Sequence, residues 1–267
     1  MAGDVPGGTV SMLVCFRGPR FKRTSGVAQT MIMIRKPEDI YLASGVIEEG
    51  TFLGRWHFSF GENYDPENMG FGTLRVFNDD TLSPGAVWPL HPHREIEVVT
   101  YCAEGEFRHA DEHGAGGVLK KGWVQHTTVG RGMSHSEINN RKDAEMRFIQ
   151  MWFHPQKKGL EPSVEQKAVE RPERTNRWLP LVSKKHPGAL PIHQDAQVHA
   201  SFLERGHSLT YELSKGRGAY VYAVEGGPIK IASASLPEFG AAKLVGEERA
   251  SIMSEGDAEL LLVDVVS

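Results

Sequence analysis

Residues 85–105, GAVWPLHPHREIEVVTYCAEG, and residues 130–139, GRGMSHSEIN, decide the fold and indicate the chemistry. The first stretch places His91 and His93 two positions apart, with one residue between them, and the second places His135 and Glu137 at the same spacing. Alternate residues of a β-strand point to one face, so each pair directs both side chains at one point if it lies on a strand. A lone His-x-His pair is often accidental on a solvated strand. Two such pairs in a glycine-rich setting favour a metal site.

The two pairs together offer three imidazoles and one carboxylate. This set suits a divalent first-row metal such as iron, nickel, manganese or zinc. In an octahedral ion it leaves two positions for water, substrate or oxygen. The sequence therefore predicts one metal site and leaves the metal open.

Short strand patterns surround both pairs. Residues 97–101 are rich in β-branched side chains and are followed by the turn sequence Ala103-Glu104-Gly105, while residues 146–152 form a second strand pattern. Closely spaced short strands with glycine turns indicate a jelly-roll β-barrel, whose interior can hold a small ligand and a metal.

The spacing of the motifs resembles that of a known family. Gly85, His91-x-His93, Glu97 and Gly105 are close to the first cupin motif, and residues 130–139 are close to the second. Further runs are similar to the pirin family of bicupins and occur in its order: Trp56–Phe60, Tyr64–Pro66, Gly70–Asp80, His91–Arg94, Thr100–Gly105 and Gly130–Glu137. The resemblance covers roughly residues 33 to 266.

The resemblance implies an all-β bicupin, two packed jelly-roll barrels with a few short helices in the connectors. It implies that His91, His93, His135 and Glu137 bind one divalent metal, usually Fe(II), with nickel, manganese, cobalt or zinc as alternatives in purified protein. Glu97, a ligand in many other cupins, is not one in pirins. Many pirins carry glycine at the position of Glu95, whose charge we expect beside the mouth of the site.

The chain divides into four predicted parts. These are an N-terminal extension (1–30), a metal-binding cupin domain (31–153) whose first strand is expected at residues 31–34, a proline-rich connector (154–191) and a C-terminal cupin domain (192–267). The sequence Tyr101-x-x-Glu104-Gly105 recurs as Tyr222-x-x-Glu225-Gly226, which indicates two related halves. No histidine or cysteine follows His207, so we expect no metal in the C-terminal barrel. We expect that barrel to pack against the first and to help wall its pocket.

The remaining polar candidates have ordinary structural interpretations. His109 and His113 are expected in a solvated turn, His126 in the core or on the surface, and His57 packed and hydrogen-bonded. Because metal-bound imidazoles need partners for their second nitrogen, Gln125 and Gln150 are candidates for that role.

Composition excludes several classes of protein. The 267 residues carry a net charge of −4, which gives no support for a nucleic-acid binder. Only Cys15 and Cys102 are present, which favours a reducing compartment such as the cytoplasm. No apolar run approaches the roughly 18–20 residues that span a bilayer. A self-contained bicupin is expected to be a monomer.

Two functions remain. The resemblance implies a dioxygenase that cleaves a flavonol such as quercetin, or a similar enediol or phenol, with O₂, and in which Glu137 takes a proton from a substrate hydroxyl. The alternative is a non-enzymatic, metal-dependent regulator that binds a protein partner, either as a transcriptional cofactor or as a modulator of a metabolic enzyme. The fold hosts both classes.

Overall fold

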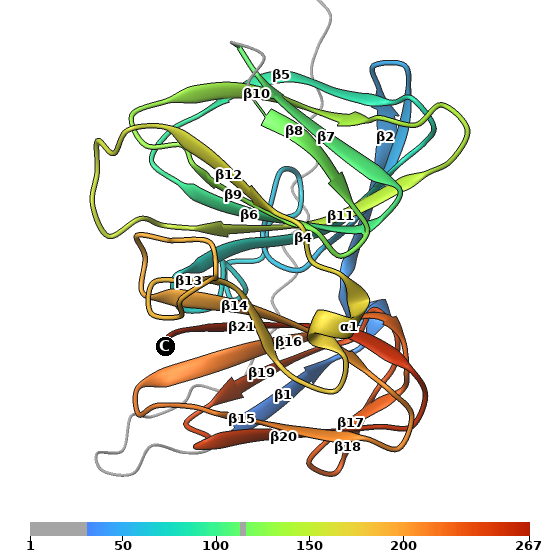
Figure 1. Ribbon diagram of the computed structural model, residues 1–267, viewed down its shortest axis with the longest axis vertical. Coiled ribbons are helices and arrows are strands. Elements are labelled where there is room, and N and C mark those ends of the chain that lie inside the picture. Colours follow the sequence, from blue (N-terminus) through green and yellow to red (C-terminus); the bar gives the residue numbers. More distant parts are fainter. Residues whose placement is uncertain (1–30, 113–115) are drawn as a thin grey trace, which may run out of the picture.

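The computed structural model describes residues 31–112 and 116–267, and these residues form two β-barrels that pack against each other through their large sheets, one above the other in Figure 1. The predicted N-terminal extension and His113 lie outside the described residues. The predicted all-β bicupin class is confirmed, with a single-turn helix α1 (Arg171–Arg174) and a 3₁₀ turn η1 (Pro37–Asp39) in connecting segments. In the described part, no helix is long and apolar enough to cross a membrane.

The N-terminal barrel consists of two antiparallel sheets. The seven-stranded sheet has the order β12 (Ser163–Lys167), β9 (Val124–Thr128), β6 (Glu97–Glu104), β11 (Met146–Phe153), β4 (Leu74–Leu82), β3 (Gly50–Trp56) and β2 (Tyr41–Ile47). The four-stranded sheet has the order β5 (Val87–His93), β10 (Met133–Asn139), β7 (Glu106–Asp111) and β8 (Gly116–Lys120). Leu82, Phe107 and Phe148 are buried together between them.

The C-terminal barrel is built in the same way. Its six-stranded sheet has the order β1 (Met31–Arg35), β19 (Ala241–Val245), β16 (Arg217–Gly226), β21 (Ala258–Val266), β14 (Ala196–Leu203) and β13 (Leu179–Ser183). Its four-stranded sheet has the order β15 (Ser208–Glu212), β20 (Arg249–Ser254), β17 (Ile229–Ile231) and β18 (Ala234–Leu236). The interior is aliphatic and includes Val221, Ile252 and Leu262.

The first strand pairs across the predicted domain limit. β1 forms at the predicted place but pairs with β19 in the C-terminal barrel, with Met31 opposite Val245. The segment predicted as a connector contributes β12 to the edge of one large sheet and β13 to the edge of the other. The limits of the four parts stay a prediction, and this pairing favours a boundary after residue 35.

Two buried carboxylates, Asp79 and Glu259, lie in the contact between the barrels. Asp79 on β4 is fully buried and accepts hydrogen bonds from Arg147 Nε at 2.7 Å and from the Tyr222 hydroxyl of the other barrel. Reciprocally, Tyr101 of the first barrel donates to Glu259 Oε1 of the second at 2.7 Å. Each buried carboxylate thus has a partner from the opposite barrel.

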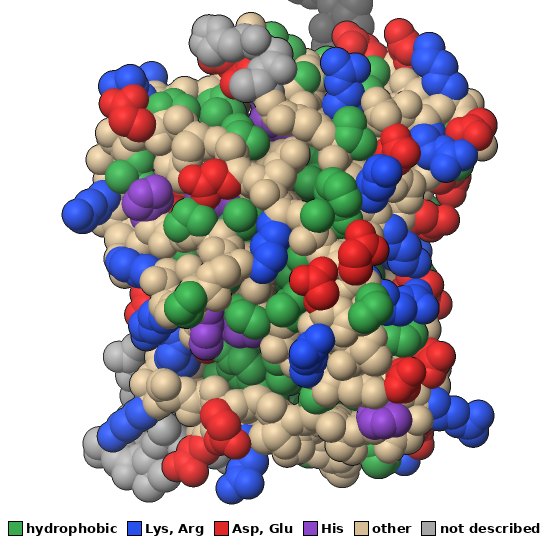
Figure 2. Space-filling view, viewed as in Figure 1, with side chains coloured by type: hydrophobic (Ala, Val, Ile, Leu, Met, Phe, Trp, Pro, Cys, Tyr) green, Lys and Arg blue, Asp and Glu red, His purple; other side chains and the backbone are tan. Residues whose placement is uncertain are grey.

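The outer surface has mixed charge. On the face shown in Figure 2, lysine and arginine side chains are interspersed with aspartate and glutamate. This face therefore presents no basic stripe of the kind that binds nucleic acid.

Replacing Arg147 with methionine should strongly destabilise the protein. Methionine keeps most of the side-chain volume but leaves the Asp79 carboxylate buried without its cation, and such a loss costs about 3–5 kcal/mol in the free energy of unfolding. Urea denaturation monitored by circular dichroism measures this change. The matched control is Arg131→Met, because Arg131 and Glu161 form an ion pair whose side chains are 64% and 73% exposed. Equal stability of the two variants would contradict the proposed role of Arg147.

Candidate metal centre

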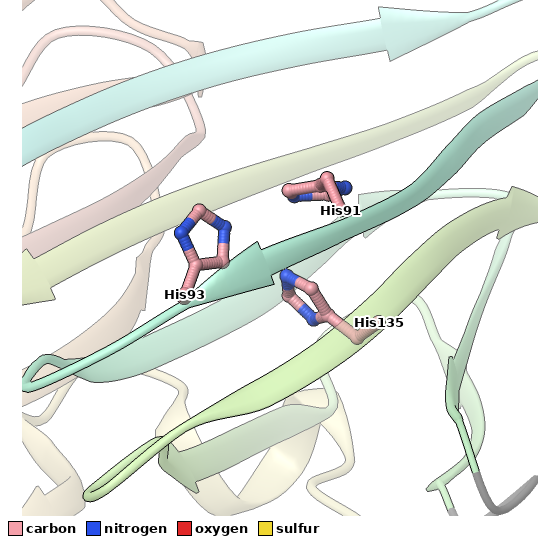
Figure 3. Close-up of side chains that lie close together, drawn as sticks. All are labelled: His91, His93 and His135. Carbon is pink, nitrogen blue, oxygen red and sulfur yellow. The ribbon is translucent and has the colours of Figure 1, made fainter.

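The register between β5 and β10 brings the three predicted histidines together. In this antiparallel pair His135 lies opposite His91, and Met133 lies opposite His93. His91 and His93 therefore reach the same face from one strand, and His135 joins them from the next (Figure 3). One candidate nitrogen from each ring lies within 4.8 Å of the other two. This is a spacing at which one cation can contact all three imidazoles.

The hydrogen bonds of these rings leave one nitrogen of each free. His91 Nδ1 lies 2.8 Å from the carbonyl oxygen of Pro89, which only accepts, so Nδ1 carries the proton and Nε2 has a free lone pair. His135 Nδ1 is bonded to His109 Nε2 at 2.7 Å. The Nε2 atoms of His93 and His135 are buried and have no hydrogen-bond partner. Buried polar atoms without partners are rare in proteins, and a cation would satisfy these two.

Burial also sets the charge of the rings. It lowers the pKa of His135 to about 2 and that of His93 to about 4, and neighbouring imidazoles add to both shifts. Both rings are therefore neutral at ordinary pH. A neutral imidazole is the form that binds a metal.

Glu137 lies next to this group. It follows His135 by two residues on β10, is 5% exposed, and lines the same cavity as His91 and His93. Burial raises the pKa of Glu137, whereas His91 and the hydrogen bond from Gln150 oppose this shift. The strand register slips between His135 and Glu137, which faces Trp88 across the pair. The ligand roles of the three histidines and Glu137 stay predictions.

The orientation of Gln150 is fixed by Trp152. Trp152 Nε1, which can only donate, bonds to Gln150 Oε1 at 3.0 Å. The Gln150 amino group consequently faces away from the indole and donates to Glu137 Oε1. This chain of bonds holds one carboxylate oxygen of Glu137 in place as an acceptor.

The cavity beside these residues is small and aromatic. Its volume is about 90 Å³, and its described lining comprises Trp56, Phe60, Asn78, Asp80, Trp88, His91, His93, Glu137, Gln150 and Trp152. All of these belong to the N-terminal barrel. The expectation that the C-terminal barrel walls the pocket is therefore wrong for the described residues, because its six-stranded sheet packs against the outer face of the large N-terminal sheet.

Comparison with known proteins identifies the family. A family model described as Pirin matches residues 44–153, and one described as the Quercetinase C-terminal cupin domain matches residues 181–265. A pirin-like protein of Caulobacter vibrioides is 35% identical over 232 residues, 86% of this chain and 98% of its own. The chain belongs to the pirin family.

Other pirin relatives carry functional names. A quercetin 2,3-dioxygenase of Escherichia coli K12 is 30% identical over 236 residues, 88% of this chain and 99% of its own. The crystal structure of YhhW from Escherichia coli has a TM-score of 0.81 at 28% identity, covering 88% of this chain and 97% of that one. A second structure, of the bacterial pirin YhhW in complex with nickel(II), has a TM-score of 0.79 at 29% identity, covering 88% of this chain and 99% of that one.

The expectation of a solvated His109 is wrong. His109 lies on β7, is 2% exposed, and its ring lies beside that of His135 on the neighbouring strand. β7 continues further than the charged sequence suggested, and the strand alternation turns His109 inward. Phe107 and His109 alternate with the exposed Arg108, and this alternation is the signal in the sequence that marks His109 as an inward residue.

The hydrogen bonds of the other polar candidates show where each of them belongs. Gln150 bonds to Glu137 and Trp152, and Gln125 bonds to Thr127 and Gln166 on its own sheet. Neither therefore takes the predicted place beside an imidazole, and Gln150 joins the centre through Glu137 instead. His57 is buried and bonds to the Tyr220 hydroxyl at 2.7 Å, as predicted.

Glu97 forms hydrogen bonds across the contact between the barrels. Its two oxygens accept the backbone N–H groups of His193 and Gln194 at 2.7 and 2.9 Å, and His126 Nε2 lies 3.3 Å from Oε1. His126 is buried, which agrees with the core position, one of its two expected places. Glu95 has φ of 55°, a conformation that glycine adopts more easily, and its carboxylate accepts the Gly159 N–H at 2.9 Å.

Replacing His109 with alanine should weaken metal binding. Its ring orients His135 and, when His135 Nε2 binds a cation, accepts a hydrogen bond from the His135 Nδ1–H. Loss of such a partner costs about 10–100-fold in metal affinity. Titration against a chelator of known affinity measures the change. His207→Ala, at an exposed turn of the C-terminal barrel, is the control. Unchanged affinity in His109→Ala would show that His135 does not depend on this contact.

The metal-free protein should lose stability as the pH falls. In the unfolded chain a histidine titrates near pH 6.5, whereas His93 and His135 titrate at about 4 and about 2 when folded. At a pH between the folded and the unfolded pKa values, the unfolded state binds more protons than the folded state. The free energy of unfolding therefore decreases as the pH is lowered. We expect a lower melting temperature at pH 5 than at pH 7, and a smaller difference in a His93→Gln, His135→Gln double variant. The same difference in both proteins would contradict this assignment.

Proposed function

We propose that this pirin is a metal-dependent dioxygenase that holds one divalent ion, Fe(II), through His91, His93, His135 and Glu137. Its substrate would be a flavonol such as quercetin, or a related enediol or phenol. The observation that carries the proposal is the convergence of three imidazoles at an aromatic cavity, two of them neutral and with buried, unpartnered Nε2 atoms. The relative of Escherichia coli named quercetin 2,3-dioxygenase supports the same reaction class.

The donor set fits this ion. Imidazole and carboxylate ligands suit iron, and the three histidines contribute no charge, so a divalent ion with Glu137 keeps one net positive charge. When bound, the ion would supply Lewis acidity toward a substrate hydroxyl and the redox capacity for reaction with O₂. A net positive centre favours the deprotonated form of a phenol or enediol.

Glu137 would accept the substrate proton. Gln150 donates to Oε1 and holds the carboxylate in place, and the remaining lone pairs of its two oxygens would serve the ion and a proton from a hydroxyl in the cavity. Burial raises the pKa of this carboxyl, and a raised pKa makes it a better base. The bond from Trp152 to Gln150 would keep the carboxylate aligned during transfer.

The aromatic residues would hold the ring and exclude water. Trp56, Phe60, Trp88 and Trp152 present flat apolar surfaces to the cavity. Trp152 also packs edge-on against His93, with 4.7 Å between ring centroids. Aromatic pairs prefer such offset or edge-on contacts, so a planar substrate ring suits this lining.

Iron-loaded protein should consume O₂ and release carbon monoxide when quercetin is added. In Glu137→Gln protein brought to full metal occupancy, the rate should fall by about 10²-fold or more, because glutamine keeps an oxygen but cannot take the proton. An oxygen electrode measures the uptake of O₂, and a carbon monoxide assay measures the released product. Glu248→Gln, exposed in the C-terminal barrel, is the control.

If the rate of the Glu137→Gln variant falls only in proportion to the metal it has lost, Glu137 is a ligand and does not act as a base. If metal-replete protein shows neither oxygen uptake nor carbon monoxide release with flavonols, enediols or phenols, the dioxygenase proposal fails. The metal-dependent regulatory role would then be the proposal that remains.

A further inference from the structure

The C-terminal barrel covers only part of the large N-terminal sheet. β2 is the last strand of that sheet, at the right of the upper barrel in Figure 1. On its outer face Leu42 and Val46 are 60% and 86% exposed, and Leu53 of β3 is 41% exposed. The register places Leu42 opposite Arg55 and Val46 opposite Thr51, so these side chains share one face. Leu42, Val46 and Leu53 form an apolar strip on the face that elsewhere packs against the C-terminal barrel.

A groove between the two barrels borders the apolar strip. Its volume is about 500 Å³, and clefts that bind ligands occupy about 300–1,000 Å³. Thr51, Leu53 and Arg55 line it from β3, and Glu238 and Phe239 line it from the C-terminal barrel. The Arg55 guanidinium lies 3.9 Å from the centre of the Phe239 ring. The apolar strip and the groove therefore form one surface that spans both barrels.

The groove has an excess of negative charge. In its described lining, Lys121 is paired with Glu225 and Arg147 with Asp79, so Arg55 is the one cation without an ion pair there. Three exposed carboxylates of the lining form no ion pair with described residues, and these belong to Glu104, Glu145 and Glu238. Three negative charges against one positive charge favour a cationic occupant.

The N-terminal extension, outside the described residues, has the complementary sequence. Residues 10–16, Val-Ser-Met-Leu-Val-Cys-Phe, are mainly apolar. No acidic residue occurs between Val5 and Lys36. Residues 17–23 carry four positive charges, on Arg17, Arg20, Lys22 and Arg23. An apolar run followed by a basic run matches an apolar strip beside an acidic groove.

The extension is long enough to reach this surface. Met31, the first described residue, lies opposite Val245, and Phe239 precedes Val245 by six residues. Phe239 therefore lies about 20 Å from Met31, at about 3.3 Å per strand residue. An extended chain from Arg23 to Met31 spans up to about 26 Å. Arg23 and the residues before it can thus enter the groove without any change in β1.

We propose that residues 10–23 bind this surface of their own chain. The basic residues 17–23 occupy the groove beside Glu104, Glu145 and Glu238, and the apolar residues 10–16 cover the apolar strip. An exposed ion pair contributes only about 0–1 kcal/mol, so binding depends on several pairs together with the apolar contact. The extension then joins the two barrels along the side of their contact, and this role is independent of the metal centre.

Paramagnetic broadening in the full chain tests this assignment. Cys15 lies within the apolar run and Cys102 is fully buried, so a nitroxide reagent modifies Cys15 in the folded protein. The methyl signals of Leu42, Val46 and Leu53 should then lose most of their intensity in the NMR spectrum. The methyl signal of Met253, 40% exposed in the four-stranded sheet of the C-terminal barrel, should keep its intensity.

A charge variant separates specific binding from random contact. Replacing the three unpaired glutamates of the groove with glutamine should restore the three signals, because the basic run loses its partners. The matched control removes three exposed carboxylates that lie outside the groove and should leave the broadening unchanged. The test variant combines Glu104→Gln, Glu145→Gln and Glu238→Gln, and the control combines Glu161→Gln, Glu212→Gln and Glu248→Gln.

Three results would overturn the proposal. The first is full intensity of the three methyl signals in the labelled wild type, and the second is equal broadening in the charge variant. The third comes from a mixed sample, in which protein with observable methyl groups carries no nitroxide and the nitroxide-bearing protein is invisible. Broadening in that sample would assign the surface to the extension of a second copy.

Discussion

The face-to-face packing of the two large sheets is the contact on which the molecule depends. Residues from both barrels form one buried cluster there, including Phe77, Met151, Tyr220 and Val263. A sheet that is covered on one side by its own barrel and on the other by its partner is buried on both faces. Polar groups in it must find partners within the protein. The Asp79 and Glu259 networks meet that requirement, since each carboxylate receives an arginine and a tyrosine.

The networks also show how the two halves correspond. The register places Arg147 opposite Glu104 in one barrel and Glu259 opposite Glu225 in the other. Arg147 and Glu259 therefore occupy equivalent positions with opposite charge, while Tyr101 and Tyr222 both reach across the contact. Gly105 and Gly226 have φ of 73° and 75° at the matching turns, where left-handed backbone favours glycine. The short sequence echo thus marks residues that the contact between the barrels requires.

The local sequence pattern predicts which side chains share a face of one strand. It does not predict which strands lie next to each other in a sheet. His91 and His93 share a face because they are two residues apart, and pairing with β10 adds His135. The position of β7 beside β10 is not readable from the sequence, so the contact between His109 and His135 appears only in the structure. The strand β1 illustrates the same limit. Its existence follows from residues 31–34, but its pairing with β19 depends on contacts more than 200 residues away in the chain.

β4 couples the contact between the barrels to the cavity. Asn78, Asp79 and Asp80 are consecutive, and alternation turns the outer two toward the cavity and Asp79 toward the other barrel. Burial raises the pKa of Asp80 well above its ordinary value, and the charges of Glu137 and Asp79 add to this shift. A displacement of β4 that disturbed the Asp79 bonds would also move both polar groups of the cavity wall. The C-terminal barrel lines none of the described cavity, yet through Tyr222 it fixes the strand that does.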